Sequence, residues 1–204
     1  SGMKIYNKNK KIIDKITKEF SVDKELLLSL MGIETNFGSY LGKMDIVSSL
    51  ATLSYDKRRS EFFTSELITL LILFDKGIIN PKNYLGSWAG AFGNFQFMPS
   101  TIEKYAIDYN DNNIIELKNS TDSFASAANY LKKMGWKKNE PCFKQVSLKP
   151  DTPKKFLNTS AKKIKYKKKL KYYKKYIKNK LTLDDNVNVA IVTPDADIVD
   201  NAKI

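Results

Sequence analysis

Apolar residues recur three to four positions apart from the N-terminus to about Trp136, the spacing of one buried face of an α-helix. In the first segment with this spacing, the apolar positions are Ile12, Ile13, Ile16 and Phe20. The same spacing predicts further helices over residues 46–55, 61–75 and 121–134. Another helix is predicted to begin near Pro99, because proline suits a first helical turn. This part of the chain is therefore expected to be almost wholly helical.

The leucine-rich segment after Ser21 predicts another helix, with apolar residues at Leu26, Leu27, Leu28, Leu30 and Met31. Ser21 is a candidate N-cap for this helix. Gly38 is a candidate C-terminal stop, because glycine tolerates the left-handed backbone that ends many helices. These limits place Glu34 in the last turn of the helix.

The pattern changes after residue 138. Three prolines interrupt residues 139–160, which predicts a linker. Residues 162–180 are mostly lysine and tyrosine, and they keep helical spacing at Tyr166, Leu170, Tyr173 and Ile177, which predicts a basic helix that packs by one face. Val187, Val189 and Ile191 alternate with other residues, as in a β-strand.

The predicted fold class is α+β and mostly α. A helical domain is expected over residues 3–138, followed by the linker and by a small second part over residues 161–204 that looks truncated. Ser1 and Gly2 precede Met3 and look like a cloning remnant, so they carry no weight in the fold prediction.

The composition excludes several classes of site. The chain has no histidine, which excludes Ser-His-Asp and Cys-His catalytic groups and His-ligated metals. Cys142 is the only cysteine, so intrachain disulfides and Cys-held iron–sulfur clusters are excluded as well. No glycine-rich phosphate-binding motif is present. An enzyme of this composition has to use Glu, Asp, Lys or Tyr for acid–base chemistry.

The charge is strongly positive. Lys and Arg number 35 against 22 Asp and Glu, a formal net charge of +13. This balance favours a polyanionic partner such as nucleic acid, anionic lipid or an acidic wall polymer. Lysines that merely coat the surface are an equally open explanation. Over residues 162–180 the tyrosines fall on the stripe needed for packing, which favours a solvated helix face over a surface that stacks bases.

Glu34 lies in the segment Gly32–Gly38, among apolar neighbours at the end of a helix. A carboxyl group that is partly buried in this way can hold a proton and pass it to a leaving oxygen near neutral pH. Spacing alone favours the simpler interpretation, a solvent-exposed helix glutamate.

Arg58 and Arg59 are the only two arginines in a lysine-rich chain. A guanidinium binds a carboxylate through two parallel hydrogen bonds, which lysine cannot do, so the pair is a candidate site for an anionic ligand group. The alternative is a surface position that flanks the next helix and pairs with Glu61.

The segment from Gly86 to Pro99 is rich in glycine, with apolar rings at Trp88, Phe92, Phe95 and Phe97. Ser87, Asn94 and Gln96 add neutral hydrogen-bonding groups. Aromatic faces beside such groups suit sugar recognition. A tight loop tucked into the core is the alternative.

Oxygen-bearing side chains stand at the first, third and fifth positions of a loop, Asp108, Asn110 and Asn112. Ile114 offers a backbone carbonyl at the seventh position, as in a calcium loop. Asn113 replaces the usual glycine at the sixth, and Asn119 replaces the usual glutamate at the twelfth. Asp122 is the candidate closing ligand. A polar turn without an ion is the alternative.

Taken together, these segments resemble the membrane-bound lytic transglycosylase B family. The resemblance runs from about Leu26 to Trp136 and consists of motifs in the family's order, namely residues 32–38, 50–55 with 58–63, 86–93, 96–100, the Asp108 loop, and 128–136. Each motif is weak by itself, but their shared order is specific.

The resemblance implies a lysozyme-like helical catalytic domain and a peptidoglycan lytic transglycosylase. Its reaction cleaves the bond between N-acetylmuramic acid and N-acetylglucosamine without water. Glu34 matches the catalytic acid/base, Arg58 and Arg59 match the pair that meets the peptide stem, and Ser87, Gln96 and Tyr130 match positions in the glycan groove. A structural calcium ion is implied at Asp108, Asn110, Asn112, Ile114 and Asp122, and no cofactor takes part in the chemistry.

The resemblance also implies a monomer in the periplasm of a Gram-negative bacterium, membrane-associated and able to meet other cell-wall enzymes, with no nucleic-acid partner. Family members continue beyond the point where this chain stops, with a strand and a Tyr/Asn-containing segment that is not found here. A weak or inactive peptidoglycan-binding module is therefore the alternative function.

Overall fold

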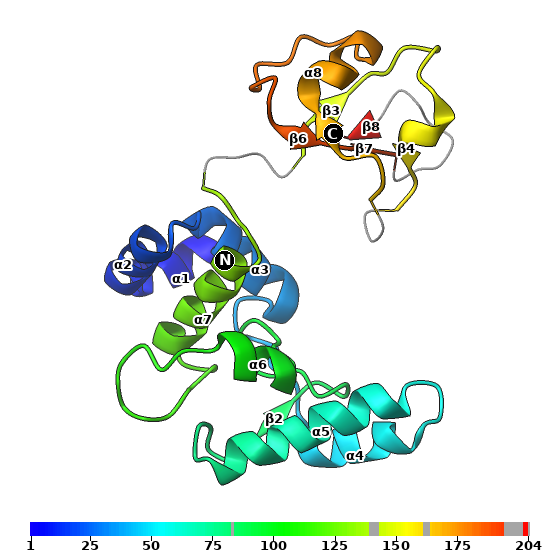
Figure 1. The fold of residues 1–204 in the computed structure, drawn as a ribbon. Coiled ribbons are helices and arrows are strands. Elements are labelled where there is room, and N and C mark those ends of the chain that lie inside the picture. Colours follow the sequence, from blue (N-terminus) through cyan, green and yellow to red (C-terminus); the bar gives the residue numbers. More distant parts are fainter. Residues whose placement is uncertain (83, 139–142, 161–163, 194–201, 204) are drawn as a thin grey trace. The chain divides into compact units, whose positions relative to one another are not determined.

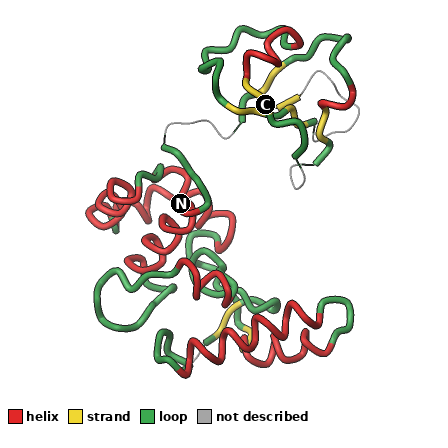
Figure 2. Tube along the Cα trace, in the orientation of Figure 1, coloured by secondary structure: helices red, strands yellow, loops and turns green. Residues whose placement is uncertain are grey.

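The computed structural model describes residues 1–82, 84–138, 143–160, 164–193 and 202–203. The chain forms two compact units, Ser1–Asn139 and Glu140–Ile204 (Figure 1). Helices dominate the first unit, whereas short strands and loops make up most of the second (Figure 2). The predicted fold class, mostly helical with a small strand-containing part, is confirmed.

The helices of the first unit enclose one apolar core. They are α1 Gly2–Lys8, α2 Lys10–Phe20, α3 Lys24–Thr35, α4 Ile46–Tyr55, α5 Ser60–Asp75, α6 Pro99–Tyr105 and α7 Ser120–Lys133. Helix α5 packs against α4 and α6, and α2 packs against α7. The residues Leu27, Leu50 and Phe124 are fully buried in this core. The helices predicted over residues 46–55, 61–75 and 121–134 and near Pro99 are thereby confirmed as α4, α5, α7 and α6.

Two short strands join distant parts of the first unit. Strand β1, Met44–Asp45, precedes α4 and pairs antiparallel with β2, Leu85–Gly86. The pairing fixes the start of α4 beside the glycine-rich segment that follows β2.

The ends of α3 differ from the prediction. Ser21 is not its N-cap, because Ser21 takes the left-handed conformation that ends α2, and Asp23 stands at the N-cap of α3 instead. The helix also stops at Thr35, before Gly38. Asn36 and Phe37 already adopt left-handed backbone, with φ of 48° and 59°, so the chain leaves the helix earlier than a glycine signal indicates.

The second unit is built from short elements. They are β3 Gln145–Val146, a 3₁₀ turn Lys154–Phe156, β4 Leu157–Asn158, β5 Lys168–Lys169, α8 Leu170–Tyr173, a second 3₁₀ turn Lys174–Tyr176, β6 Asn188–Val189, β7 Ile191–Val192 and β8 Ala202–Lys203. The strand order of its larger sheet is β3-β8-β7-β4, with β4 and β7 parallel, and β5 pairs with β6. The strand predicted from Val187 to Ile191 corresponds to β6 and β7.

The prediction of a linker over residues 139–160 is wrong for its described part. Val146, Leu148 and Phe156 are buried in the core of the second unit, so this stretch folds. Pro150 lies in a turn, and Pro153 precedes the first 3₁₀ turn. Residues 139–142, Cys142 among them, lie outside the described residues.

The long basic helix predicted over residues 162–180 is also wrong, because the described part of this segment forms β5, the short helix α8 and a 3₁₀ turn instead. Tyr166 has a left-handed backbone, with φ of 55°, and the buried Asn158 side chain binds both the backbone N–H and the carbonyl of Lys165. These contacts hold the chain out of a helix. Leu170, Tyr173 and Ile177 are nevertheless buried, as their spacing predicts.

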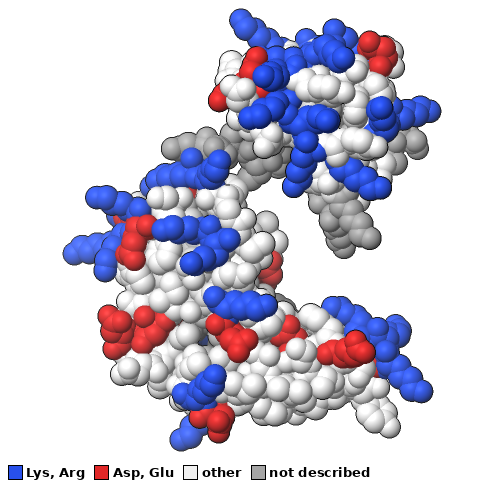
Figure 3. All heavy atoms as spheres, in the orientation of Figure 1, with Lys and Arg blue, Asp and Glu red and all other residues white. Residues whose placement is uncertain are grey.

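Positive charge is concentrated in the second unit. Residues 140–204 contain 16 lysines and 7 acidic residues, and lysine side chains spread over the visible face of this unit (Figure 3). Among the described residues of the unit, Lys174 with Asp185 is the one ion pair. Most of this charge is therefore not neutralised within the unit, and both explanations of the lysines stay open.

Candidate active site

Glu34 lies in the last turn of α3, and its neighbour Thr35 fixes that end of the helix. The Thr35 hydroxyl is 3.0 Å from the Met31 carbonyl oxygen and 2.9 Å from the Asn94 carbonyl oxygen. It also accepts a hydrogen bond from the Gly38 N–H, at 3.0 Å. Thr35 is only 1% exposed, so these bonds tie the end of α3 to the glycine-rich segment in a dry environment.

The carboxyl group of Glu34 is exposed in the free protein, as the simpler interpretation of the spacing predicted, and the interpretation as a partly buried carboxyl is wrong. The physical reason is the direction of its apolar neighbours. Ile33 is 79% exposed, while the Phe37 ring turns back over Gly32. Neither side chain covers the carboxyl group, which is accessible to a ligand that approaches the end of α3.

The glycine-rich segment is buried in part and exposed in part. Phe92, Phe95 and Phe97 are buried in the core, as a structural loop requires. Trp88 is 68% exposed and remains accessible for a ligand. Ser87 closes the turn that carries Trp88, since its side-chain oxygen accepts the Ala91 N–H at 2.9 Å.

Gln96 precedes Phe97 in the chain, and Tyr130 packs against Phe97. The Gln96 amide lies 3.0 Å from the Gly93 carbonyl oxygen and 3.5 Å from that of Leu41, in the chain that follows α3. Tyr130, on α7, packs its ring against Phe97 with centroids 5.8 Å apart. Both side chains are thus held by the same loop that holds Thr35.

Asn94 is a structural hub rather than a ligand-binding group of the loop. It is 3% exposed, and its amide nitrogen donates to the Ser123 hydroxyl at 2.9 Å and to the Lys118 carbonyl at 3.2 Å. Its backbone N–H donates to the Leu117 carbonyl at 2.9 Å. Together with the Thr35 contact, these bonds join α3, the glycine-rich loop and α7 at one residue.

The two arginines have different surroundings, and neither pairs with Glu61 as the surface alternative predicted. The Arg58 guanidinium binds the Asp56 carboxylate, with Nη2 2.6 Å from Oδ2, and these hydrogen bonds lower the pKa of Asp56 to about 2. The Arg59 guanidinium lies over the rings of Phe62 and Phe63, 4.6 and 5.0 Å from their centroids. The hydrogen-bonding edge of Arg59 is therefore the more available of the two.

The Asp108 loop is wound around its own side chains. Asp108 accepts the N–H groups of Asn112 and Asn113, and the Asn112 side chain accepts the N–H of Ile114. Asp122 is fully buried at the base of the loop and accepts two backbone N–H groups. These contacts bring the predicted calcium-loop residues together.

Electrostatics in this loop favour a cation. Burial raises the pKa of the Asp122 carboxyl, and the negative charges of Asp108 and Glu116 add to the effect. Sequence reasoning missed Glu116, although it continues the alternation of Asp108, Asn110, Asn112 and Ile114 at the ninth loop position. No cluster of three or more His, Cys, Asp or Glu side chains is set to hold a metal in the part of the chain that the structure describes. Carbonyl and amide oxygens would therefore have to supply much of the coordination, which calcium accepts.

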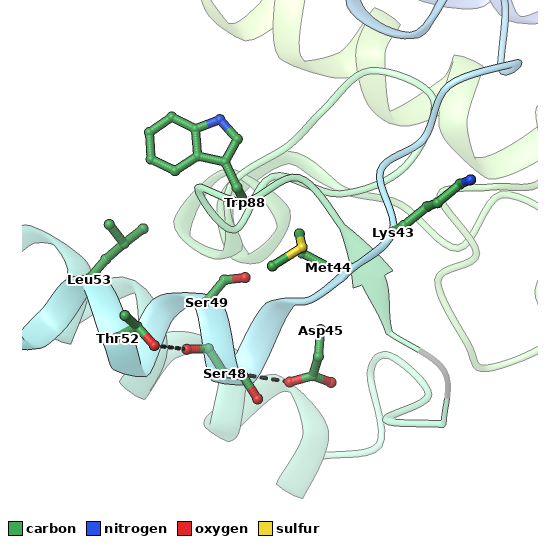
Figure 4. A pocket seen from close by; sticks show the side chains of 8 residues that line it. All are labelled: Lys43, Met44, Asp45, Ser48, Ser49, Thr52, Leu53 and Trp88. Carbon is green, nitrogen blue, oxygen red and sulfur yellow. Dashed lines mark hydrogen bonds between the residues drawn. The ribbon is translucent and has the colours of Figure 1, made fainter.

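A pocket of about 420 Å³ lies between α4, β1 and the turn that carries Trp88 (Figure 4). Of the candidate residues named from the sequence, Trp88 alone lines this pocket, and it directly follows Ser87. Ser48, Ser49 and Thr52 contribute hydroxyl-bearing side chains from α4. The sequence contains no signal for these three residues, since serine and threonine on a helix are common.

Comparison with known proteins shows which family shares this arrangement. The model of the transglycosylase SLT domain family matches residues 1–199. Membrane-bound lytic murein transglycosylase B of Escherichia coli is 36% identical over 141 residues, which cover 69% of this chain and 39% of that protein. The chain thus spans well under half the length of that relative.

Solved structures share the fold. SltB3 from Pseudomonas aeruginosa, in complex with NAG-anhNAM-pentapeptide, superimposes with a TM-score of 0.83 and 28% identity over 95% of this chain and 52% of that one. The Escherichia coli lytic transglycosylase Slt35 in complex with calcium gives a TM-score of 0.77 and 29% identity over 94% of this chain and 60% of that one.

Within the described residues, no helix is long and apolar enough to span a membrane.

Proposed function

This chain belongs to the transglycosylase SLT domain family, and from that premise we propose that it cleaves the glycan strands of peptidoglycan as a lytic transglycosylase. The observation that carries the proposal is the accessible carboxyl of Glu34, on a helix end that Thr35 fixes to the glycine-rich loop. A catalytic group has to be both reachable and held in place.

One carboxyl group is enough for this reaction. Glu34 protonates the glycosidic oxygen between N-acetylmuramic acid and N-acetylglucosamine, and the acetamido oxygen of the substrate stabilises the cationic C1. Glu34 then takes the proton of the muramoyl C6 hydroxyl as that oxygen attacks C1. The bond to the leaving sugar breaks, a 1,6-anhydro ring forms, and no water is consumed. The attack is intramolecular, which favours it over attack by water.

The substrate supplies what the free protein lacks. A sugar ring over the end of α3 covers the exposed Glu34 carboxyl and removes water from it, which strengthens its interaction with the reacting oxygens. Ser87, Gln96 and Tyr130 line the groove in this proposal and orient the glycan. The P. aeruginosa SltB3 complex with NAG-anhNAM-pentapeptide supports both the substrate class and the anhydro product.

Mass spectrometry of the soluble products from purified peptidoglycan tests the proposed function. Fragments that end in 1,6-anhydro-N-acetylmuramic acid are expected. Reducing ends would show hydrolysis and contradict the mechanism. Glycan binding without any product would favour the alternative, a weak or inactive peptidoglycan-binding module.

The cellular setting follows from the substrate. We propose that the protein works as a monomer in the periplasm of a Gram-negative bacterium, in contact with glycan strands, peptide stems and other cell-wall enzymes. The name of its membrane-bound E. coli relative supports association with a membrane. Cell fractionation checks this proposal, and recovery in the cytoplasmic fraction would contradict it.

The arginines are proposed to meet the carboxylates of the peptide stem. Arg59→Ala is expected to lower kcat/KM about tenfold on peptide-bearing glycan, the loss of one charge-assisted hydrogen bond, and to spare naked glycan. Arg58→Ala is the matched variant, and its loss is expected to be smaller because Asp56 already occupies the Arg58 guanidinium. Steady-state kinetics on both substrates measure this. Equal losses of Arg59→Ala on the two substrates would remove the stem-binding role.

The Asp108 loop is proposed to bind a structural calcium ion through Asp108, Asn110, Asn112, the Ile114 carbonyl and Asp122, with Glu116 nearby. Calcium at about 100 times its Kd is expected to add about 2.7 kcal/mol of stability, or roughly 5–10 °C in Tm. Thermal unfolding with calcium and with a chelator measures the difference. Asp108→Asn should reduce it, whereas Asp111→Asn, whose carboxylate is not among these ligands, should not. An unchanged Tm would show that the loop is a turn without an ion.

A further inference from the structure

The pocket beside α4 has an unsatisfied polar group in its wall. Ser49 is 7% exposed, and its buried hydroxyl oxygen has no hydrogen-bond partner. Two other hydroxyls on the same helix are paired, since Thr52 donates to the Ser48 carbonyl at 2.8 Å and Ser54 to the Leu50 carbonyl at 2.7 Å. An unpaired buried hydroxyl lowers the stability of the fold, so a ligand group that forms a hydrogen bond with the Ser49 hydroxyl would gain free energy that the folded chain itself does not supply.

The opposite wall of the pocket is an exposed indole. Trp88 is 68% exposed, whereas the chain's other tryptophan, Trp136, is packed against the core and donates its ring N–H to Asp23. The turn that carries Trp88 is pressed onto α4, because a Cβ atom on Gly90 would lie 2.4 Å from a Leu50 methyl group. Trp88 is therefore held at a fixed distance from the hydroxyls of α4 (Figure 4).

The remaining lining is neutral or apolar over most of the pocket. Met44 and Leu53 contribute apolar surface, and Ser48 and Thr52 contribute hydroxyls. The charges of Lys43 and Asp45 are opposite, so they do not select an anion. One Asp45 carboxylate oxygen is already used by the Ser48 N–H, at 2.8 Å. An aromatic face beside hydroxyls and small apolar groups matches a sugar ring with an acylamino substituent, not a phosphate.

We propose that this pocket is a subsite for one N-acetylated hexosamine ring of the glycan, with the sugar stacked on Trp88 and its acetamido group bonded to the Ser49 hydroxyl. The acetamido methyl group packs against Met44 and Leu53. The proposal rests on the function proposed above. Glu34 does not line the pocket, so the subsite contributes binding along the strand and not the chemistry of bond cleavage.

Calorimetric titration with chitotetraose, a tetramer of N-acetylglucosamine, tests the subsite. Ser49→Ala is expected to weaken binding about five- to tenfold, the loss of one hydrogen bond to the ligand, while Tm stays unchanged or rises because an unpaired buried hydroxyl is gone. Trp88→Ala is expected to weaken binding more than tenfold. Ser54→Ala is the matched control, since Ser54 lies on the same helix, has a partner and does not line the pocket.

Kinetics on long glycan strands separate the subsite from the reaction. Ser49→Ala should raise KM and leave kcat unchanged, which a merely structural role would not produce. Wild-type protein that does not bind chitotetraose, or Ser49→Ala that binds it as tightly as wild type, would overturn the subsite. Anhydro products with either of those results would leave the proposed function intact. Ser49-dependent binding without any anhydro product would instead keep the subsite and remove the lytic reaction.

Discussion

Glu34→Gln is expected to lower the release of 1,6-anhydro ends from peptidoglycan by about 1,000-fold or more. The amide can neither give a proton to the glycosidic oxygen nor take one from the C6 hydroxyl, and general acid–base catalysis by one group contributes about 10²- to 10⁴-fold. Initial rates of anhydro-product release by mass spectrometry measure the loss.

The substitution Glu34→Gln is not expected to disturb the fold. The Glu34 side chain is exposed and takes part in none of the hydrogen bonds or ion pairs of the described residues, so Tm and chitotetraose affinity should match those of wild type. Glu25→Gln, in the first turn of the same helix, is the control for loss of a carboxylate and should keep full activity. A Glu34→Gln protein that still forms anhydro ends at the wild-type rate would exclude the acid/base role.

Asn94→Leu is expected to reduce the free energy of unfolding by about 3 kcal/mol. The substitution removes the side-chain bonds to Ser123 and Lys118, and it leaves the buried Ser123 hydroxyl and Lys118 carbonyl without these partners, at about 1–3 kcal/mol for each unsatisfied group. Denaturant unfolding monitored by far-UV circular dichroism measures the change.

Activity of Asn94→Leu should fall even under conditions where the protein is folded. Asn94 joins α7 to the loop that receives the Thr35 hydroxyl, so a shift of this loop displaces the helix end that carries Glu34. Ser123→Ala is the graded control, because it removes one of these hydrogen bonds and should cost about 1 kcal/mol. Unchanged stability and rate in Asn94→Leu would show that α3 is held by its apolar contacts alone.

The helical part of the fold was predictable because its information is local. Apolar spacing placed α4, α5 and α7, Pro99 marked the start of α6, and the expected stop near Gly38 placed Glu34 in the last turn of α3. The order of the motifs along residues 26–136 then identified the family. This recognition needs only the residue types and their order in the chain. Helix ends were less predictable, since Asn36 and Phe37 take left-handed backbone without any glycine.

The second unit could not be predicted in this way. Its core joins Phe156 and Ile191, and its parallel pairing sets Leu157 opposite Ile191, far apart in the sequence. Short strands of two residues carry too little periodicity to be recognised. The long basic helix failed as a prediction because the Asn158 side chain, seven positions before Lys165, binds the backbone of Lys165 and holds it out of a helix.

The sequence by itself determined the helical class, the family and the excluded chemistries, and the resemblance to that family made Glu34 the candidate acid. Only the tertiary structure decided which groups are accessible and which are buried. In the folded chain, Glu34 and Trp88 are exposed and Asn94 is buried. Arg58 forms an ion pair with Asp56, and the Ser49 hydroxyl has no hydrogen-bond partner. The physical reason is that burial and hydrogen-bond pairing depend on residues brought together from distant segments, which local spacing does not encode.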